Sequence, residues 1–80
     1  MYLDILTPDQ TVFSGEITSV KVPGTLGSFE VLTNHAPIIS TLEKGNVTIR
    51  LGKEEKIITI DGGVVEVLHD KVIVLAEAIL

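Results

Sequence analysis

The chain has 80 residues, no cysteine and no tryptophan; it is 45% hydrophobic and carries a formal charge of −5. This length suits one domain, 1–80, and the lack of cysteine excludes a disulfide framework and a thiolate zinc site. Eleven acidic against six basic residues argue against a nucleic-acid partner, whose phosphates require excess Lys and Arg.

The N-terminus shows no basic segment followed by an apolar run, so no signal peptide is predicted. The apolar runs are far shorter than the roughly 20 residues that cross a bilayer. We therefore expect a soluble, intracellular protein that is not inserted directly into a membrane.

Apolar and polar residues alternate in short runs, the pattern of strands with one buried face. Val20 and Val22 flank Lys21, and Val47 and Ile49 continue the same pattern. The sequence predicts strands at 2–6, 10–13, 16–23, 27–32, 46–51, 55–60, 64–68 and 71–76. The runs 57–60 and 72–76 have apolar residues on both faces, so we place them centrally, with both faces covered or close to the core. No helix is predicted beyond one short turn within 37–42.

Turn residues separate these runs about every ten residues, which is typical of a sandwich or barrel of short strands. The predicted turns are at 14–15, 23–24, 33–34, 44–46, 52–53, 61–63 and 69–70. For Asp61-Gly62-Gly63 the alternative to a tight turn is a bulge where another backbone comes close. The fold class is therefore all-β.

No catalytic, metal or cofactor site is predicted. The two histidines, His35 and His69, have no cysteine and no acidic residue at ligand spacing, and His69-Asp70 is interpreted as a hairpin turn. No serine lies in a Gly-x-Ser-x-Gly elbow. The segment from Pro23 to Gly27 lacks the spacing of a phosphate-binding loop.

Several separated motifs follow one another along the chain: Val22-Pro23-Gly24-x-x-Gly27, Val31-Leu32-x-x-His35-Ala36-Pro37-Ile38-Ile39, Leu42-x-x-Gly45-x-Val47, Gly62-Gly63-x-x-Glu66-Val67 and Val72-x-Val74-Leu75-Ala76-Glu77. Together, in this order, they resemble one known family, the N-terminal domain of the ε subunit of F-type ATP synthases. The resemblance covers residues 2–77.

This resemblance implies a flattened antiparallel sandwich of two sheets with about eight to ten short strands. It also implies a non-catalytic rotor subunit that joins the γ subunit to the c-ring and couples proton or sodium flow to ATP synthesis. By position, the c-ring-facing loop would comprise Pro23, Gly24, Leu26, Gly27 and Ser28. The γ-facing residues would be His35, Ala36, Pro37, Ile38 and Ser40.

The resemblance places the protein peripherally at the cytoplasmic face of a bacterial inner membrane, with the plastid stroma as second choice. Family members often carry acidic residues where this chain has Leu26 and Ser28, so its c-ring contact would be less electrostatic, with Glu30 compensating in part. Most members continue into two C-terminal helices that inhibit ATP hydrolysis and in some bacteria bind ATP. We expect neither activity of a chain ending at Leu80.

Some apolar residues are predicted to remain outside the core and form a patch for γ, namely Leu26, Phe29 and Ile38. The alternative function is a biotinyl or lipoyl carrier domain with Lys71 as the modified residue, since Asp70-Lys71-Val72 lies at a predicted hairpin tip. No internal duplication supports this alternative, and no alanine follows the lysine.

Overall fold

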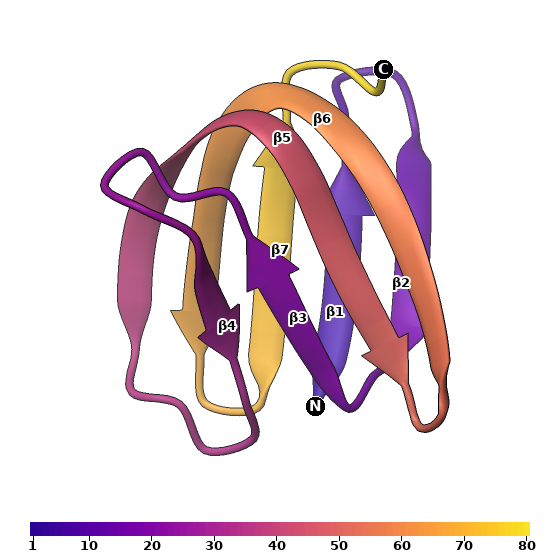
Figure 1. Cartoon of the computed structure of the whole chain (residues 1–80), viewed down its shortest axis with the longest axis vertical. Helices are drawn as coiled ribbons and strands as arrows, with labels where there is room; N and C mark the ends of the chain where they lie inside the picture. The colour runs from indigo at the N-terminus through magenta and orange to yellow at the C-terminus, as the bar shows by residue number, and fades with distance from the viewer.

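A computed structural model describes all residues, 1–80, and consists of seven β-strands without a helix (Figure 1). It therefore contains no helix of the length and apolarity needed to span a bilayer. The all-β prediction is confirmed. The strands are β1 (Tyr2–Leu6), β2 (Thr11–Glu16), β3 (Ser19–Val22), β4 (Phe29–Val31), β5 (Ile38–Leu51), β6 (Glu54–Leu68) and β7 (Lys71–Ala76).

The strands form one hydrogen-bonded ladder in the order β2-β1-β7-β6-β5-β3-β4. Each long strand has different neighbours along its length. Of β6, only the part Gly63–Leu68 pairs with β7, and of β5, only the part Thr48–Arg50 pairs with β3. The two long strands arch from one side of the molecule to the other, so the ladder folds into two facing layers (Figure 1). The expected sandwich is thus made by one bent sheet of seven strands rather than two separate sheets. Its β1–β7 pair is parallel, not antiparallel.

Two glycine-containing segments that were predicted as turns are bends within strands, and the second of them joins two predicted strands into one, which lowers the strand count from eight to seven. Residues 44–46 lie inside β5, where a Cβ at Gly45 would come within 2.9 Å of Pro23 Cβ. Residues 61–63 lie inside β6, where Gly62 and Gly63 have φ of 111° and 152°. Glycine is therefore used here for close approach and unusual backbone angles, as the alternative interpretation of residues 61–63 proposed.

Two other segments that were predicted as turns also lie inside strands. Residues 37–42 were expected to hold at most a short turn, but Ile38–Leu42 form the start of β5 and pair with Gly63–Val67. Residues 14–15 lie inside β2 because their partners across the ladder are Asp4 and Leu3. The turns at 33–34, 52–53 and 69–70 are confirmed, with positive φ at Asn34, Gly52 and His69.

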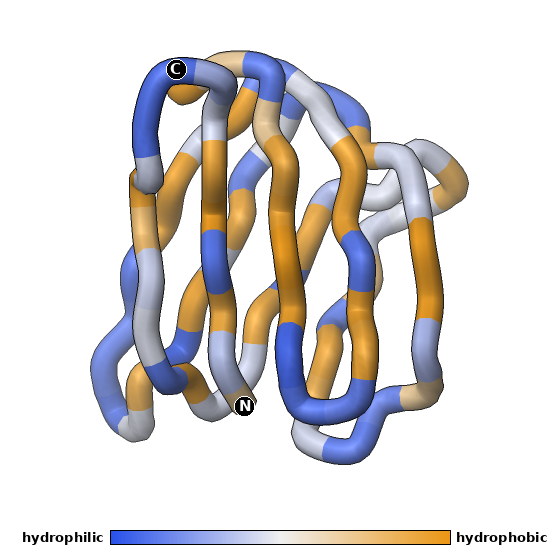
Figure 2. Tube along the Cα trace, turned by 180° about the vertical axis from the view of Figure 1, so that it is seen from behind, coloured by the Kyte–Doolittle hydropathy of each residue, from blue (hydrophilic) through white to orange (hydrophobic).

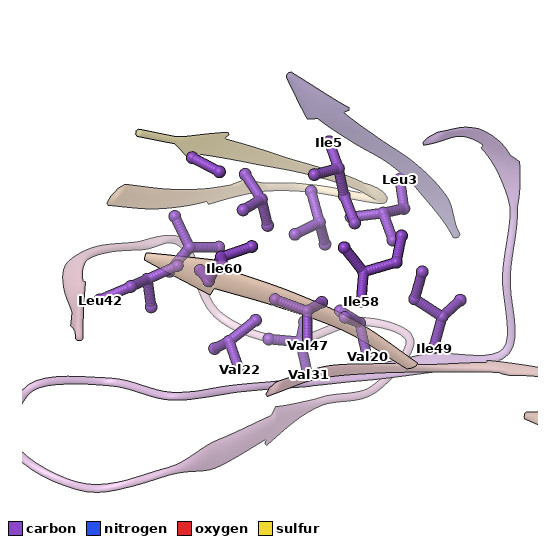
Figure 3. Packing of buried hydrophobic residues seen from close by; sticks show 14 of the residues in the cluster. Leu3, Ile5, Val20, Val22, Val31, Leu42, Val47, Ile49, Ile58 and Ile60 are labelled. Atoms are coloured by element: carbon purple, nitrogen blue, oxygen red, sulfur yellow. The ribbon is translucent and has the colours of Figure 1, made fainter. Parts of the chain in front are cut away.

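The core consists of sixteen buried aliphatic residues, and it lies between the two layers (Figure 3). Valine, isoleucine and leucine supply all but one of them, as the composition predicted. Figure 2 shows hydrophobic and hydrophilic residues alternating along several strands, consistent with one inward and one outward face. Leu3, Ile5, Val47, Ile49 and Ile60 are completely buried.

Along both long strands, the residues that face the core change from even-numbered to odd-numbered positions. In β6 the buried residues are Ile58, Ile60 and Gly62, and then Val65 and Val67. The glycines at 62 and 63 allow this change where the strand passes from one layer to the other. The central placement of 57–60 and 72–76 is confirmed, since β6 and β7 are interior strands of the ladder. Of the two alternatives given for them, coverage of both faces is wrong, because Ile57 is 53% exposed and Leu75 is 52% exposed.

Candidate partner-binding surfaces

The predicted c-ring-facing loop, residues 23–28, projects from a base that is fixed to β5. The amide of Thr25 donates to the carbonyl oxygen of Thr41 at 3.0 Å, and the amide of Glu43 donates to the carbonyl oxygen of Pro23 at 2.9 Å. Pro23 and Gly24 are buried, whereas Thr25 to Ser28 are exposed. The loop is therefore an anchored turn with an accessible tip.

Leu26 forms the apolar tip of this loop and is fully exposed. Behind it, the Gly27 amide donates to the carbonyl oxygen of Gly24 at 2.9 Å, and Gly27 has a φ of 130°. A Cβ at Gly24 would lie 2.6 Å from the Gly27 oxygen and 3.0 Å from the Phe29 ring. Only glycine therefore fits at position 24 without a shift of the loop backbone.

The predicted γ-facing residues 35–37 lie at the opposite end of the molecule from this loop, in the connection between β4 and β5 (Figure 1). The His35 amide donates to the Leu32 carbonyl at 3.1 Å, and His35 Nδ1 lies 2.7 Å from the Ala36 carbonyl oxygen. Ala36 and Pro37 are exposed. These contacts give the corner a defined shape.

An open cavity of about 450 Å³ lies beside this corner. Both histidines of the chain contribute to it, a proximity that sequence reasoning missed because His35 and His69 are 34 positions apart. No group of three His, Cys, Asp or Glu side chains is placed to hold a metal ion. The lining residues are Asn34, His35, Ala36, Pro37, His69 and Asp70.

Two predicted γ-facing residues point toward the interior instead. Ile38 is partly buried and packs against the core, and Ser40 is half-buried with its Oγ donating to the Thr41 carbonyl at 3.1 Å. The accessible residue of this segment is Ile39, which is 71% exposed. Residues 38 and 40 share the face of the buried Leu42, so the period of two could have identified Ile39.

Ile39 belongs to an apolar outer surface that covers parts of β5, β6 and β7. It lies opposite Glu66 across the ladder, while Val64 lies opposite Leu75. A second cavity of about 330 Å³ follows this surface and is lined by Pro37, Ile38, Ile39, Glu66, Val67 and Leu68. Of the residues predicted to form an exposed patch, Leu26 is exposed, but Phe29 and Ile38 pack against the core.

Glu30, which was expected to compensate for missing acidic residues in the first loop, already has partners in β3 and β5. It accepts a hydrogen bond from Ser19 Oγ at 3.0 Å, and Arg50 Nε lies 3.6 Å from the same carboxylate. Arg50 also reaches Glu55 at 3.1 Å. Lys71, the residue of the carrier alternative, begins β7 and lies 3.6 Å from Asp4.

The sequence matches, over residues 1–80, the family described as ATP synthase, Delta/Epsilon chain, beta-sandwich domain. It is 39% identical to an ATP synthase epsilon chain of Caulobacter vibrioides over 77 residues, covering 96% of this chain and 90% of that one. An epsilon chain of Chlorobium limicola is 45% identical over 76 residues, with 94% and 86% covered. By contrast, the chain spans 54% of the Dehalococcoides mccartyi epsilon chain, to which it is 40% identical.

Solved structures share the fold at much lower identity. A chain from the Euglena gracilis mitochondrial ATP synthase, in an assembly of OSCP, F1 and c-ring, superposes with a TM-score of 0.91 at 18% identity, covering 98% of this chain and 51% of that one. A chain from the central stalk and c-ring of the Tetrahymena thermophila enzyme gives 0.84 at 15% identity, with 99% and 64% covered. The match over the whole chain and the identity to several epsilon chains show that this protein belongs to the β-sandwich domain family of ATP synthase delta and epsilon chains.

Proposed function

We propose that this domain is a non-catalytic part of the central stalk of an F-type ATP synthase, where it joins the γ subunit to the c-ring and couples ion flow to ATP synthesis. The observation that carries the proposal is the separation of two accessible features on one rigid body. The loop with Leu26 is at one end, and the corner at residues 35–37, followed by Ile39, begins at the other. Such a body can hold two partners at once.

The c-ring contact is assigned to the loop at residues 23–28. Its base is hydrogen-bonded to β5, so a force applied at the tip reaches the sheet directly. Leu26 supplies apolar contact area, and the neighbouring Thr25 and Ser28 supply hydroxyl groups. This composition suits contact with a c-ring loop that is polar and also carries some apolar surface.

The γ contact is assigned to the corner and the apolar outer surface that begins at Ile39. An exposed apolar area of this kind is typical of a surface covered by a partner protein. Ile39 of β5 and Leu68 of β6 are both exposed and line the same cavity, and Glu66 of β6 lies opposite Ile39 across the ladder. The γ subunit would bury these side chains on assembly.

The layered core suits a part that transmits torque. Cross-strand hydrogen bonds connect all seven strands, and a close-packed aliphatic core resists deformation. We assign no catalytic step, cofactor or nucleotide to the domain. Its proposed place is peripheral, at the cytoplasmic face of a bacterial inner membrane.

Co-purification with the γ subunit of the same ATP synthase tests the proposal. Ile39→Asp and Ile57→Asp form a matched pair, since both replace an exposed isoleucine in a strand, but on different layers. We expect wild type and the Ile57 variant to co-purify with γ. The Ile39 variant should lose the complex, because a carboxylate buried without a partner is costly. Failure of the wild-type domain to bind γ would contradict the proposal.

A further inference from the structure

The two-layer fold leaves four strand edges, and they differ in how well they are protected against pairing with another chain. β4 has only three residues, and the exposed side chains of β2 are the polar Thr11, Ser14 and Glu16. The free edge of β6 begins with three charged residues, 54–56, and the C-terminal tail covers it from Thr59 to Asp61. The fourth edge is the first part of β5.

The direction of the backbone groups along this part of β5 follows from its existing hydrogen bonds. The Thr41 carbonyl and the Glu43 amide both bond to residues 23–25, so they point away from β6. In an antiparallel strand the direction alternates with each residue. The amide and carbonyl of Ile39 therefore also point away from β6, as does the amide of Thr41.

No hydrogen bond within the chain uses these outward groups of Ile39. Residues 23–25 occupy the same side of β5 but extend only as far as Thr41, after which the loop turns away at Leu26. The outer edge of β5 is therefore paired with residues 23–25 at Thr41 to Glu43 and unpaired at residues 38–40. Side chains beside it form the cavity of about 330 Å³.

We propose that the edge of β5 at Ile39 binds an extended segment of the γ subunit by adding it to the sheet as a further strand. Main-chain hydrogen bonds would supply affinity in this binding mode, and side-chain pockets would supply selectivity. The identity of the partner rests on the proposed function; the binding mode rests on the free edge.

The groove defines the chemistry of that segment. Its lining is mainly apolar, through Pro37, Ile39 and Leu68, and Glu66 is its one charged side chain. Glu66 takes part in none of the ion pairs of the chain. The segment therefore carries apolar residues facing Ile39 and Leu68 and a lysine or arginine facing Glu66.

Amide hydrogen exchange tests the inference without any substitution. In the domain alone, the Ile39 amide should exchange rapidly although it lies in a strand, whereas the Ser40 and Leu42 amides, which face β6, should exchange slowly. Saturation with γ should slow exchange at Ile39 at least tenfold. If γ binds and exchange at Ile39 is unchanged, the inference is wrong while the proposed function stands.

A matched pair of proline variants provides the second test. Ile39→Pro removes the outward amide, and Ile57→Pro does the same at the free edge of β6, where Thr59 already faces the tail. We expect the first variant to bind γ about 10-fold to 100-fold more weakly, because the amide donor is lost and the carbonyl of γ that it would pair with is left buried without a hydrogen bond. The second should bind within about twofold of wild type, a difference too small to indicate a lost hydrogen bond.

The remaining outcomes are also decisive. Equal binding of γ by both proline variants would overturn the added-strand mode. Protection of Ile39 in the domain alone that increases with concentration would show that a second copy of this chain takes the edge, which also contradicts the proposal. No binding of γ by the wild-type domain would remove the proposed function as well.

Discussion

The backbone of Gly63 lies so close to the carbonyl oxygen of Leu75 that a side chain at position 63 would collide with it. A Cβ there would also lie 3.0 Å from Ala76 Cα, and the φ of Gly63 is 152°. This approach occurs where β6 bends between the two layers. The bend, and with it the closure of the sandwich, depends on glycine at this position.

Gly63→Ala should therefore destabilise the domain by about 2 kcal/mol or more, since both the contact and the backbone angle are unfavourable. Gly15→Ala is the matched control in β2, because a Cβ there would meet only Phe13, at 3.8 Å. The control should remain within about 0.5 kcal/mol of wild type or be slightly more stable. Urea unfolding of the three proteins measures the difference, and equal midpoints would contradict this account of the bend.

Ile49 and Ile57 provide a comparison between core and surface at one residue type. Ile49 is completely buried in β5, and Ile57 is half-exposed on the outer face of β6. Ile49→Ala should reduce the free energy of unfolding by about 2–5 kcal/mol, because it leaves a cavity. Ile57→Ala should change it by about 0.5 kcal/mol or less. Similar losses at both positions would show that the outer face is covered in the isolated domain.

The period of two and the spacing of turn residues were enough to predict the fold class and several of the turns, and the composition predicted the aliphatic core. The turn signal failed at 44–46 and 61–63 because glycine there permits close approach of other backbone segments, and a local pattern cannot distinguish this use from a turn. Pro23 meets Gly45 across 22 positions of sequence, a contact that only the folded chain defines. The long strands and the folding of one ladder into two layers follow from such contacts.

The accessible surfaces were predicted less completely than the fold. Leu26 was expected to remain outside the core, and it is exposed. Ile38 was assigned by its position in the family motif, and because the start of β5 was not recognised as a strand, its inward and outward faces could not be told apart. The cavity joining His35 to His69 depends on two turns meeting at one end of the fold, which no spacing in the sequence indicates.

The N-terminal amine should make stability depend on pH in a chain that begins at Met1 with a free α-amino group. A hydrogen bond to Glu16, at 3.1 Å, and the nearby charge of Asp70 raise the pKa of this amine above its ordinary value of 8.0. A raised pKa means that the stabilisation is complete below pH 8.0 and is lost as the pH rises through the folded-state value.

Thermal unfolding of wild type and Glu16→Gln between about pH 7 and about pH 10 measures this effect. Wild type should have the higher Tm at the lower pH, and the difference should shrink as the pH rises. N-terminal acetylation should remove the pH dependence of the difference. A difference that stays constant over the whole range would contradict the assigned pairing.

ATP should not bind to this 80-residue chain. Neither cavity is lined by a lysine or an arginine, and Glu66 in the second would repel a phosphate group. Titration calorimetry with ATP should give no saturable heat, and a nucleotide-binding epsilon chain would serve as the positive control. Stoichiometric binding would contradict this prediction and reveal a phosphate site outside the two cavities.

Restoration of coupling is the most direct test of the central claim that the domain joins γ to the c-ring. Wild type, Ile39→Asp and Leu26→Lys would each be added to an ATP synthase of the same source that lacks its ε chain, and ATP-driven ion pumping, ATP hydrolysis and γ binding would be measured. Wild type should restore pumping, with ATP hydrolysis measured alongside as the control for an intact catalytic part. Leu26→Lys should bind γ but fail to restore pumping, and Ile39→Asp should do neither. If wild type binds γ and pumping is not restored, or if both variants restore it fully, the account is contradicted.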